Sequence, residues 1–135
     1  MKDLEALLPE SNRFCISVDE SFLDVLAISD LLVSFSSTTI EEAFQNLVPV
    51  LLYGGGGRYQ HVKATDVVPN IPIKPSAVYS IRSKEFLSDG LVKILDANSK
   101  ATRPGELFQD LVYKQDEIVP LSEILIDALD YSSDK

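Results

Sequence analysis

Four consecutive hydroxyl residues, Ser36, Ser37, Thr38 and Thr39, stand directly before an apolar pattern of helical spacing. The first N–H groups of a helix have no partner within the helix, and they lie at the positive end of the helix dipole. A polar turn at a helix start is therefore a typical site for an anion, most often a phosphate group. This turn predicts a site for a nucleotide or a nucleotide-sugar.

Helix capping alone is the alternative interpretation of the same turn. Thr38 with Glu41, and Thr39 with Glu42, both match the S/T-x-x-E pattern of a capping box, in which side chains satisfy N–H groups of the first turn. Such a box would explain these residues without any ligand. Both interpretations stay open at this point, and Glu41 is expected to be a solvated or capping residue.

A second group of polar and glycine residues follows the next apolar segment. Residues 54–57 are all glycine, which permits close approach of the backbone to a ligand but equally permits a mobile loop. They match neither G-x-G-x-x-G nor a P-loop. The guanidinium of Arg58 could hold two phosphate oxygens, or Arg58 could be a surface residue. His61 is the only histidine and Cys15 the only cysteine, so no zinc pattern is present and no metal is expected.

Apolar patterns predict the elements that position these residues. Continuous apolar runs predict strands at 14–18, 31–35, 50–53 and 77–81, and helical spacing predicts helices at 21–27, 40–47, 83–95, 106–113 and 121–129. The 40–47 helix is expected to bury Ile40, Ala43, Phe44 and Leu47 on one face, and Leu95 is expected on the apolar face of the 83–95 helix. Residues 59–75 contain three prolines and are expected to form a short helix and a loop.

Buried strands alternating with helices predict an α/β domain of the doubly wound, Rossmann-like type, a parallel sheet with helices on both faces. Ligands bind such sheets at the carboxyl ends of the strands. The hydroxyl turn and the glycine run are expected at that edge. Tyr79 and Arg82, at the end of the fourth predicted strand, could close over a base or a phosphate.

Composition narrows the class of protein further. The chain has 135 residues, 45% of them hydrophobic, which suits one domain, 1–135, with a packing helix and a loose acidic tail at 116–135. The net charge of −9 argues against binding to the backbone of a nucleic acid. Neither a signal peptide nor an apolar run long enough to span a bilayer is present in the sequence, so a cytoplasmic location is expected.

One motif carries a resemblance to a known family. An apolar strand and a small-residue turn are followed by Thr38-Thr39, by Glu42, and by Pro49 seven residues later. This pattern resembles the nucleotide-sugar site in the C-terminal domain of GT-B glycosyltransferases, in particular the peptidoglycan GlcNAc transferase and surface-carbohydrate transferases. The resemblance covers residues 29–60. It departs from the family where Ser36-Ser37 stands in place of glycine and where Arg58 follows four glycines.

The resemblance implies roles for individual residues. Ser37, Thr38 and Thr39 would contact the diphosphate of the donor, and Glu42 would accept hydrogen bonds from the ribose hydroxyls. Gln60 and His61 lie nearest the position of a polar pair that contacts the sugar. The full set of expected substrate-binding residues is Ser36, Ser37, Thr38, Thr39, Glu42, Gly56, Gly57, Arg58, Gln60 and His61.

The resemblance also implies an activity and its partners. The chain would be the donor half of a glycosyltransferase of cell-surface polysaccharide or glycolipid synthesis, with a nucleoside diphosphate sugar, a UDP-sugar by family likeness, as substrate and no cofactor. An N-terminal acceptor-binding domain or partner subunit would be needed for transfer, and any peripheral membrane association would come through it. Half of a nucleotide-sugar epimerase and a non-catalytic binding or scaffold domain are the alternatives.

Overall fold

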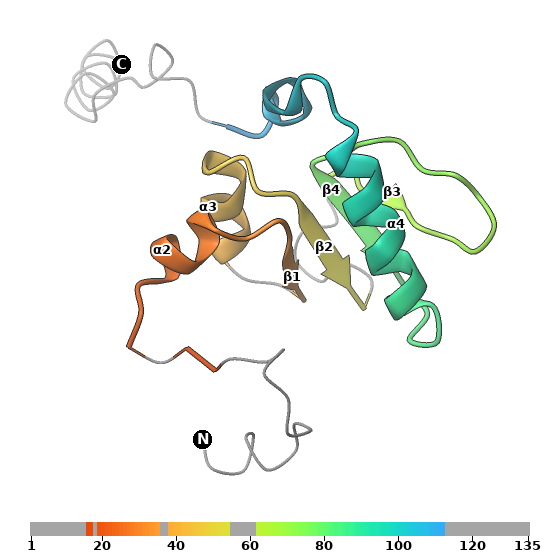
Figure 1. Ribbon diagram of the computed structural model, residues 1–135, viewed down its shortest axis with the longest axis horizontal. Helices are drawn as coiled ribbons and strands as arrows, with labels where there is room; N and C mark the ends of the chain where they lie inside the picture. Colours follow the sequence, from red (N-terminus) through yellow and green to blue (C-terminus); the bar gives the residue numbers. More distant parts are fainter. Residues whose placement is uncertain (1–15, 18, 36–37, 55–61, 113–135) are drawn as a thin grey trace, which may run out of the picture.

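The computed structural model describes residues 16–17, 19–35, 38–54 and 62–112 (Figure 1). Within these ranges the strands are β1 (Leu32–Ser34), β2 (Val50–Tyr53), β3 (Thr65–Asp66) and β4 (Val78–Ile81). The helices are α2 (Phe22–Ala27), α3 (Thr39–Gln45) and α4 (Leu87–Ser99), with a 3-10 helix, η2 (Pro104–Phe108).

The strands form one four-stranded sheet in the order β1-β2-β4-β3, and every neighbouring pair is parallel. Leu32 pairs with Val50, and Val50 pairs with Val78, so β1, β2 and β4 begin at the same level. Helix α3 connects β1 to β2, and the three form a βαβ unit. Parallel strands require such a crossover connection. The predicted α/β class with a parallel sheet is confirmed.

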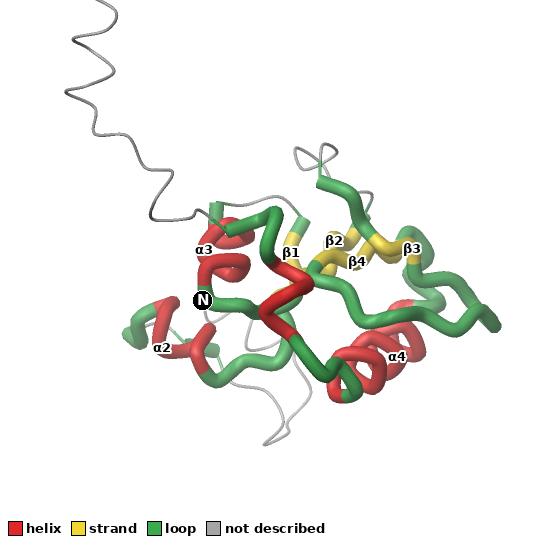
Figure 2. The backbone as a smooth tube through the Cα atoms, turned by 90° about the horizontal axis from the view of Figure 1, so that it is seen from above, coloured by secondary structure: helices red, strands yellow, loops and turns green. Residues whose placement is uncertain are grey.

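Both faces of the sheet are packed, because side chains along a strand alternate between them. Val50, Leu52 and Val78 belong to one core cluster together with Ile40, Ala43 and Phe44 of α3, Leu26 of α2 and Phe108 of η2. Leu51, Tyr79 and Ile81 belong to a second cluster, with Phe86 and with Ile94 of α4. Figure 2 shows α4 alongside β4 and β3, whereas α2 and α3 lie toward the β1 end of the sheet.

The connection from β3 to β4 contains no helix, whereas a short helix and a loop were expected over residues 59–75. The described residues of the 59–75 range contain the short strand β3 and a loop but no helix, so the predicted helix is wrong there. Pro69 and Pro72 lack the N–H that a helix interior needs. The loop is held instead by the Lys93 ammonium group of α4, which donates to the carbonyl oxygens of Val68 and Ile71 at 3.3 Å each.

Helix α3 ends earlier than its apolar spacing suggests. Leu47 has φ 58° and is 46% exposed, so it is not part of the buried helix face. The N–H of Val48 donates to the carbonyl of Ala43 at 2.9 Å, and the N–H of Leu47 donates to that of Phe44 at 3.0 Å. This is the Schellman pattern of a helix end, in which one residue takes the left-handed conformation.

Three further expectations for the elements need correction, and two others lie outside the described residues. Ile16 and Ser17, the described part of the predicted 14–18 strand, are in no strand. Leu95 is 42% exposed and so does not lie on the buried face of α4. The predicted 106–113 helix is the shorter 3-10 helix η2, which begins at Pro104. The 121–129 helix and the 116–135 tail lie outside the described residues.

Candidate functional site

The start of α3 lies at the carboxyl end of the sheet. Strand β1 ends at Ser34, Thr38 is the residue before the first helical residue, and α3 then leads back to Pro49, which precedes β2. Because β1 and β2 are parallel, the first turn of α3 must be near the carboxyl ends of both strands. Thr38 and Thr39, the described half of the hydroxyl turn, therefore lie at the edge where such sheets bind ligands, as the sequence predicts.

Thr38 does not cap the helix with its side chain. It is exposed, has helical backbone angles (φ −60°, ψ −22°), and makes no side-chain capping hydrogen bond; only its carbonyl accepts the N–H of Glu41, at 3.0 Å. The capping box of Thr38 and Glu41 is thus not formed. The second predicted capping box, that of Thr39 and Glu42, would need Thr39 as the residue before the helix. Thr39 is instead the first helical residue. Glu41 and Glu42 are both exposed.

Two aromatic side chains, Phe35 and Tyr53, lie at the same edge of the sheet. Neither was identified from the sequence. The rings of Phe35 and Tyr53 lie edge to face, with centroids 5.4 Å apart and planes at 67°. Phe35 is 65% exposed and Tyr53 is partly exposed. Gly54 follows at φ 84°, and a Cβ there would lie 3.5 Å from Cδ1 of Phe35. The sequence signal that could have identified them is an aromatic residue at the end of each of two neighbouring predicted strands.

The structure brings together part of the predicted site. Thr38 is the residue before α3, and Thr39 and Glu42 are in its first turn. Seven of the predicted residues lie outside the described ranges: Ser36, Ser37, Gly56, Gly57, Arg58, Gln60 and His61. The expectation for Tyr79 is wrong, because its side chain is fully buried, whereas Arg82 is exposed directly after β4.

The described part of the chain contains neither a cluster of metal ligands nor a helix that could span a membrane. Among residues 16–17, 19–35, 38–54 and 62–112, no group of three or more His, Cys, Asp and Glu side chains is placed to hold a metal ion. None of the helices in these ranges has both the length and the apolar character needed to cross a bilayer.

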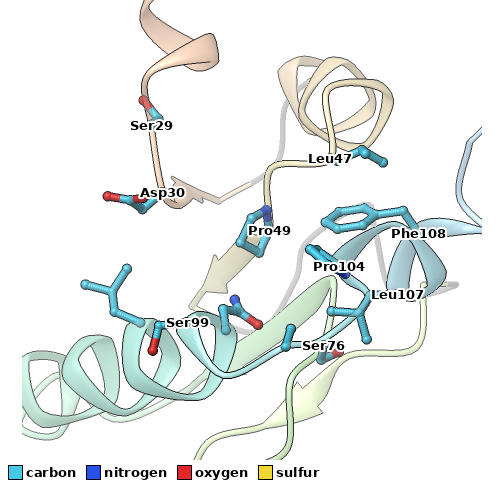
Figure 3. Close-up of a pocket in the computed structure, with 12 residues that line it drawn as sticks. Ser29, Asp30, Leu47, Pro49, Ser76, Ser99, Pro104, Leu107 and Phe108 are labelled. Atoms are coloured by element: carbon cyan, nitrogen blue, oxygen red, sulfur yellow. The ribbon is translucent and has the colours of Figure 1, made fainter.

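A pocket of about 470 Å³ lies at the opposite, amino edge of the sheet. Asp30, Pro49 and Ser76 line it, and each directly precedes a strand or lies within two residues of one. Residues from the end of α4 and from η2 complete the wall, and Figure 3 shows Phe108 and Pro104 beside Pro49. This pocket could not be predicted from the sequence, because its lining comes from five separate segments of the chain.

A partly buried polar network adjoins the pocket. The Tyr79 hydroxyl donates to Oδ1 of Asn98 at 2.7 Å and accepts the N–H of Ser76 at 2.7 Å. Burial raises the pKa of the Tyr79 hydroxyl above its ordinary value, and these hydrogen bonds offset part of that rise. Nδ2 of Asn98 is buried and has no hydrogen-bond partner among the described residues. Asn98 and Ser76 both line the pocket.

Comparisons with protein-family models, with curated proteins and with solved structures give no match for this chain. The fold therefore defines the class: an α/β domain with a four-stranded, all-parallel sheet, consistent with a Rossmann-like fold.

Proposed function

We propose that this chain is the donor-binding half of a GT-B-type glycosyltransferase and binds a nucleoside diphosphate sugar at the carboxyl edge of its sheet. The observation that carries the proposal is the placement of the first turn of α3. That turn follows β1 at the edge where parallel α/β sheets generally bind ligands, and the side chain of its capping residue, Thr38, does not cap the helix. A diphosphate would supply the acceptors that the N-terminal turn of a helix favours.

The neighbouring groups suit the other parts of a nucleotide. Glu42 lies one turn into α3 and is exposed, so its carboxylate is accessible to the two hydroxyl donors of a ribose. The exposed rings of Phe35 and Tyr53 offer an apolar surface against which a base could pack. In this proposal Arg58, Gln60 and His61 would contact the phosphates and the sugar.

Transfer itself would need a second domain or subunit that holds the acceptor and the catalytic base. Helix N-terminal groups can stabilise a leaving diphosphate without a metal ion, because they are fixed before the reaction begins. The chain by itself is expected to bind the donor and to show little or no transfer. A UDP-sugar is the proposed donor by family likeness.

The test is thermal unfolding with UDP, GDP, CDP, ADP and UDP-GlcNAc, each at about one hundred times its dissociation constant. One nucleotide at that ratio should stabilise the chain by about 2.7 kcal/mol. Glu42→Ala should remove most of this effect. Glu41→Ala is the matched control, since it removes an exposed carboxylate from the same helix turn.

A second ligand distinguishes ribose contact from a general charge effect. The 2′-deoxy form of the preferred nucleotide should bind the wild-type chain about as weakly as the ribose form binds Glu42→Ala. Glu42→Ala should not weaken the binding of the 2′-deoxy form further. Equal losses in Glu41→Ala and Glu42→Ala would contradict the assigned role of Glu42. Absence of stabilisation by any nucleotide would favour the scaffold alternative.

A further inference from the structure

We propose that the pocket at the amino edge of the sheet binds a small apolar amine that also carries a hydroxyl group. This site would be separate from the proposed nucleotide site, which lies at the other end of the strands. Its volume of about 470 Å³ falls within the range of about 300–1,000 Å³ that is usual for small-molecule sites.

Apolar side chains form much of the pocket wall, so a ligand needs an apolar body. Seven apolar residues line the pocket: Leu47, Pro49, Leu95, Ala101, Pro104, Leu107 and Phe108. Figure 3 shows Leu47, Pro49, Pro104 and Phe108 close together on one side. Leu47 and Leu95 are 46% and 42% exposed, which leaves apolar surface that a ligand would cover. An aromatic ring or a short aliphatic chain would bury this surface.

Hydrogen-bonding groups of the pocket separate into acceptors and one donor. The hydroxyls of Ser29, Ser76 and Ser99 donate to the carbonyl oxygens of residues 25, 78 and 96, at 2.7, 3.0 and 2.8 Å. Their remaining lone pairs can therefore only accept. The donor is Nδ2 of Asn98, which is buried without a partner among the described residues. A buried amide without a partner is costly, so a ligand oxygen that accepts from it would be favoured.

The charge of the pocket selects against an anion. Asp30 is the single charged residue among those that line the pocket, and Lys, Arg and His are absent from that set. The chain as a whole carries a net charge of −9. A phosphate or carboxylate would lose hydration here without gaining a cationic partner. A protonated amine would gain the Asp30 carboxylate, and a hydroxyl on the same molecule could accept from Asn98.

Three probes that share one ring test this preference: tyramine, 4-hydroxyphenethyl alcohol and 4-hydroxyphenylacetate, titrated into the full chain and followed by ¹H–¹⁵N NMR. Tyramine should bind at least about tenfold more tightly than the carboxylate, with the alcohol between them. Its shifts should map to residues 29–30, 47–49 and 95–108. Asp30→Asn should remove the advantage of tyramine over the alcohol and leave the alcohol unchanged.

Asp24→Asn is the matched control, because Asp24 is exposed in α2 and does not line the pocket. It should leave all three affinities close to those of wild type. The proposal is overturned if no probe shifts the pocket residues at millimolar concentration, if the carboxylate binds as tightly as tyramine, or if Asp24→Asn and Asp30→Asn act alike. Because none of the probes is a nucleotide, the outcome is independent of the proposed transferase function.

Discussion

The Tyr79 hydroxyl joins three parts of the molecule through single hydrogen bonds. Its ring is fully buried in the cluster beneath α4, while its oxygen contacts Ser76 before β4 and Asn98 near the end of α4. Sequence reasoning placed Tyr79 on the correct strand but at the wrong site. The reason is that Asn98 lies 19 residues away, and no local pattern shows which side chain a strand residue will meet.

We expect Tyr79→Phe to lower the free energy of unfolding by about 1–3 kcal/mol, because the partly buried N–H of Ser76 and the amide oxygen of Asn98 each lose a partner. Urea unfolding at neutral pH measures the change. Tyr53→Phe is the control, since it keeps the ring that contacts Phe35. A loss for Tyr79→Phe no larger than that for Tyr53→Phe would contradict this account of the network.

The raised pKa of Tyr79 also predicts a pH dependence of stability. The folded state holds the phenol proton more tightly than the unfolded state does. This contribution is therefore complete below about pH 10, the pKa of an unfolded tyrosine, and is lost as the pH rises through the higher folded value. Unfolding curves between pH 9 and 11 should show a steeper loss of stability in wild type than in Tyr79→Phe. Parallel losses would exclude the effect.

The β1–α3–β2 unit shows why some elements can be predicted from sequence. Strand β2 has the predicted bounds, and α3 begins at Thr39, one residue before the expected start. Both elements were predictable because the local spacing of apolar residues indicates them. Strand β3 has only two residues, Thr65 and Asp66, which is too short to show any period. It exists through its pairing with β4 and through the hydrogen bond from the Ser80 hydroxyl to Asp66.

Helix α4 packs against the sheet through a glycine. A Cβ built on Gly90 would lie 2.3 Å from Cδ1 of Ile81, which is 1% exposed. Alanine would gain about 1 kcal/mol of helix propensity, but overpacking costs about 1–3 kcal/mol. We expect Gly90→Ala to destabilise the chain by about 1 kcal/mol, as measured by thermal or urea unfolding.

The double variant Gly90→Ala, Ile81→Val tests whether the contact between residues 90 and 81 causes the destabilisation. Ile81→Val removes Cδ1, so Gly90→Ala should stabilise the Ile81→Val background by up to about 1 kcal/mol, as helix propensity predicts. Gly105→Ala is the control without a steric conflict, since nothing lies within 4 Å of its added Cβ. Additive effects of Gly90→Ala and Ile81→Val would show that the two residues do not touch as described.

At the scale of the whole molecule, the parallel α/β class was predictable and the strand order was not. Alternating buried strands and helices limit the possible architectures to a few. The order β1-β2-β4-β3 depends on which crossovers pass over which face, and the β3–β4 loop crosses without a helix. The amino-edge pocket was unpredictable for a related reason: Asp30, Pro49, Ser76 and Asn98 meet only after the sheet has formed.

The two proposed sites should respond to salt in opposite directions, because their ligands differ in charge and the chain carries a net charge of −9. The Debye length falls from about 30 Å at 0.01 M salt to about 8 Å at 0.15 M, so distant charges are screened while short hydrogen bonds persist. If N–H groups at the start of α3 hold the diphosphate, salt mainly removes long-range repulsion. UDP should then bind about two- to fivefold more tightly at 0.15 M than at 0.01 M.

Tyramine at the amino-edge pocket should show the reverse, because salt screens its attraction to Asp30 and to the net negative charge. Calorimetric titrations at both salt concentrations measure the two trends, with uridine and 4-hydroxyphenethyl alcohol as uncharged controls that should not respond. A steep weakening of UDP binding with salt would show instead that basic side chains carry the diphosphate. In that event Arg82, exposed directly after β4, and Arg58 become the first residues to substitute.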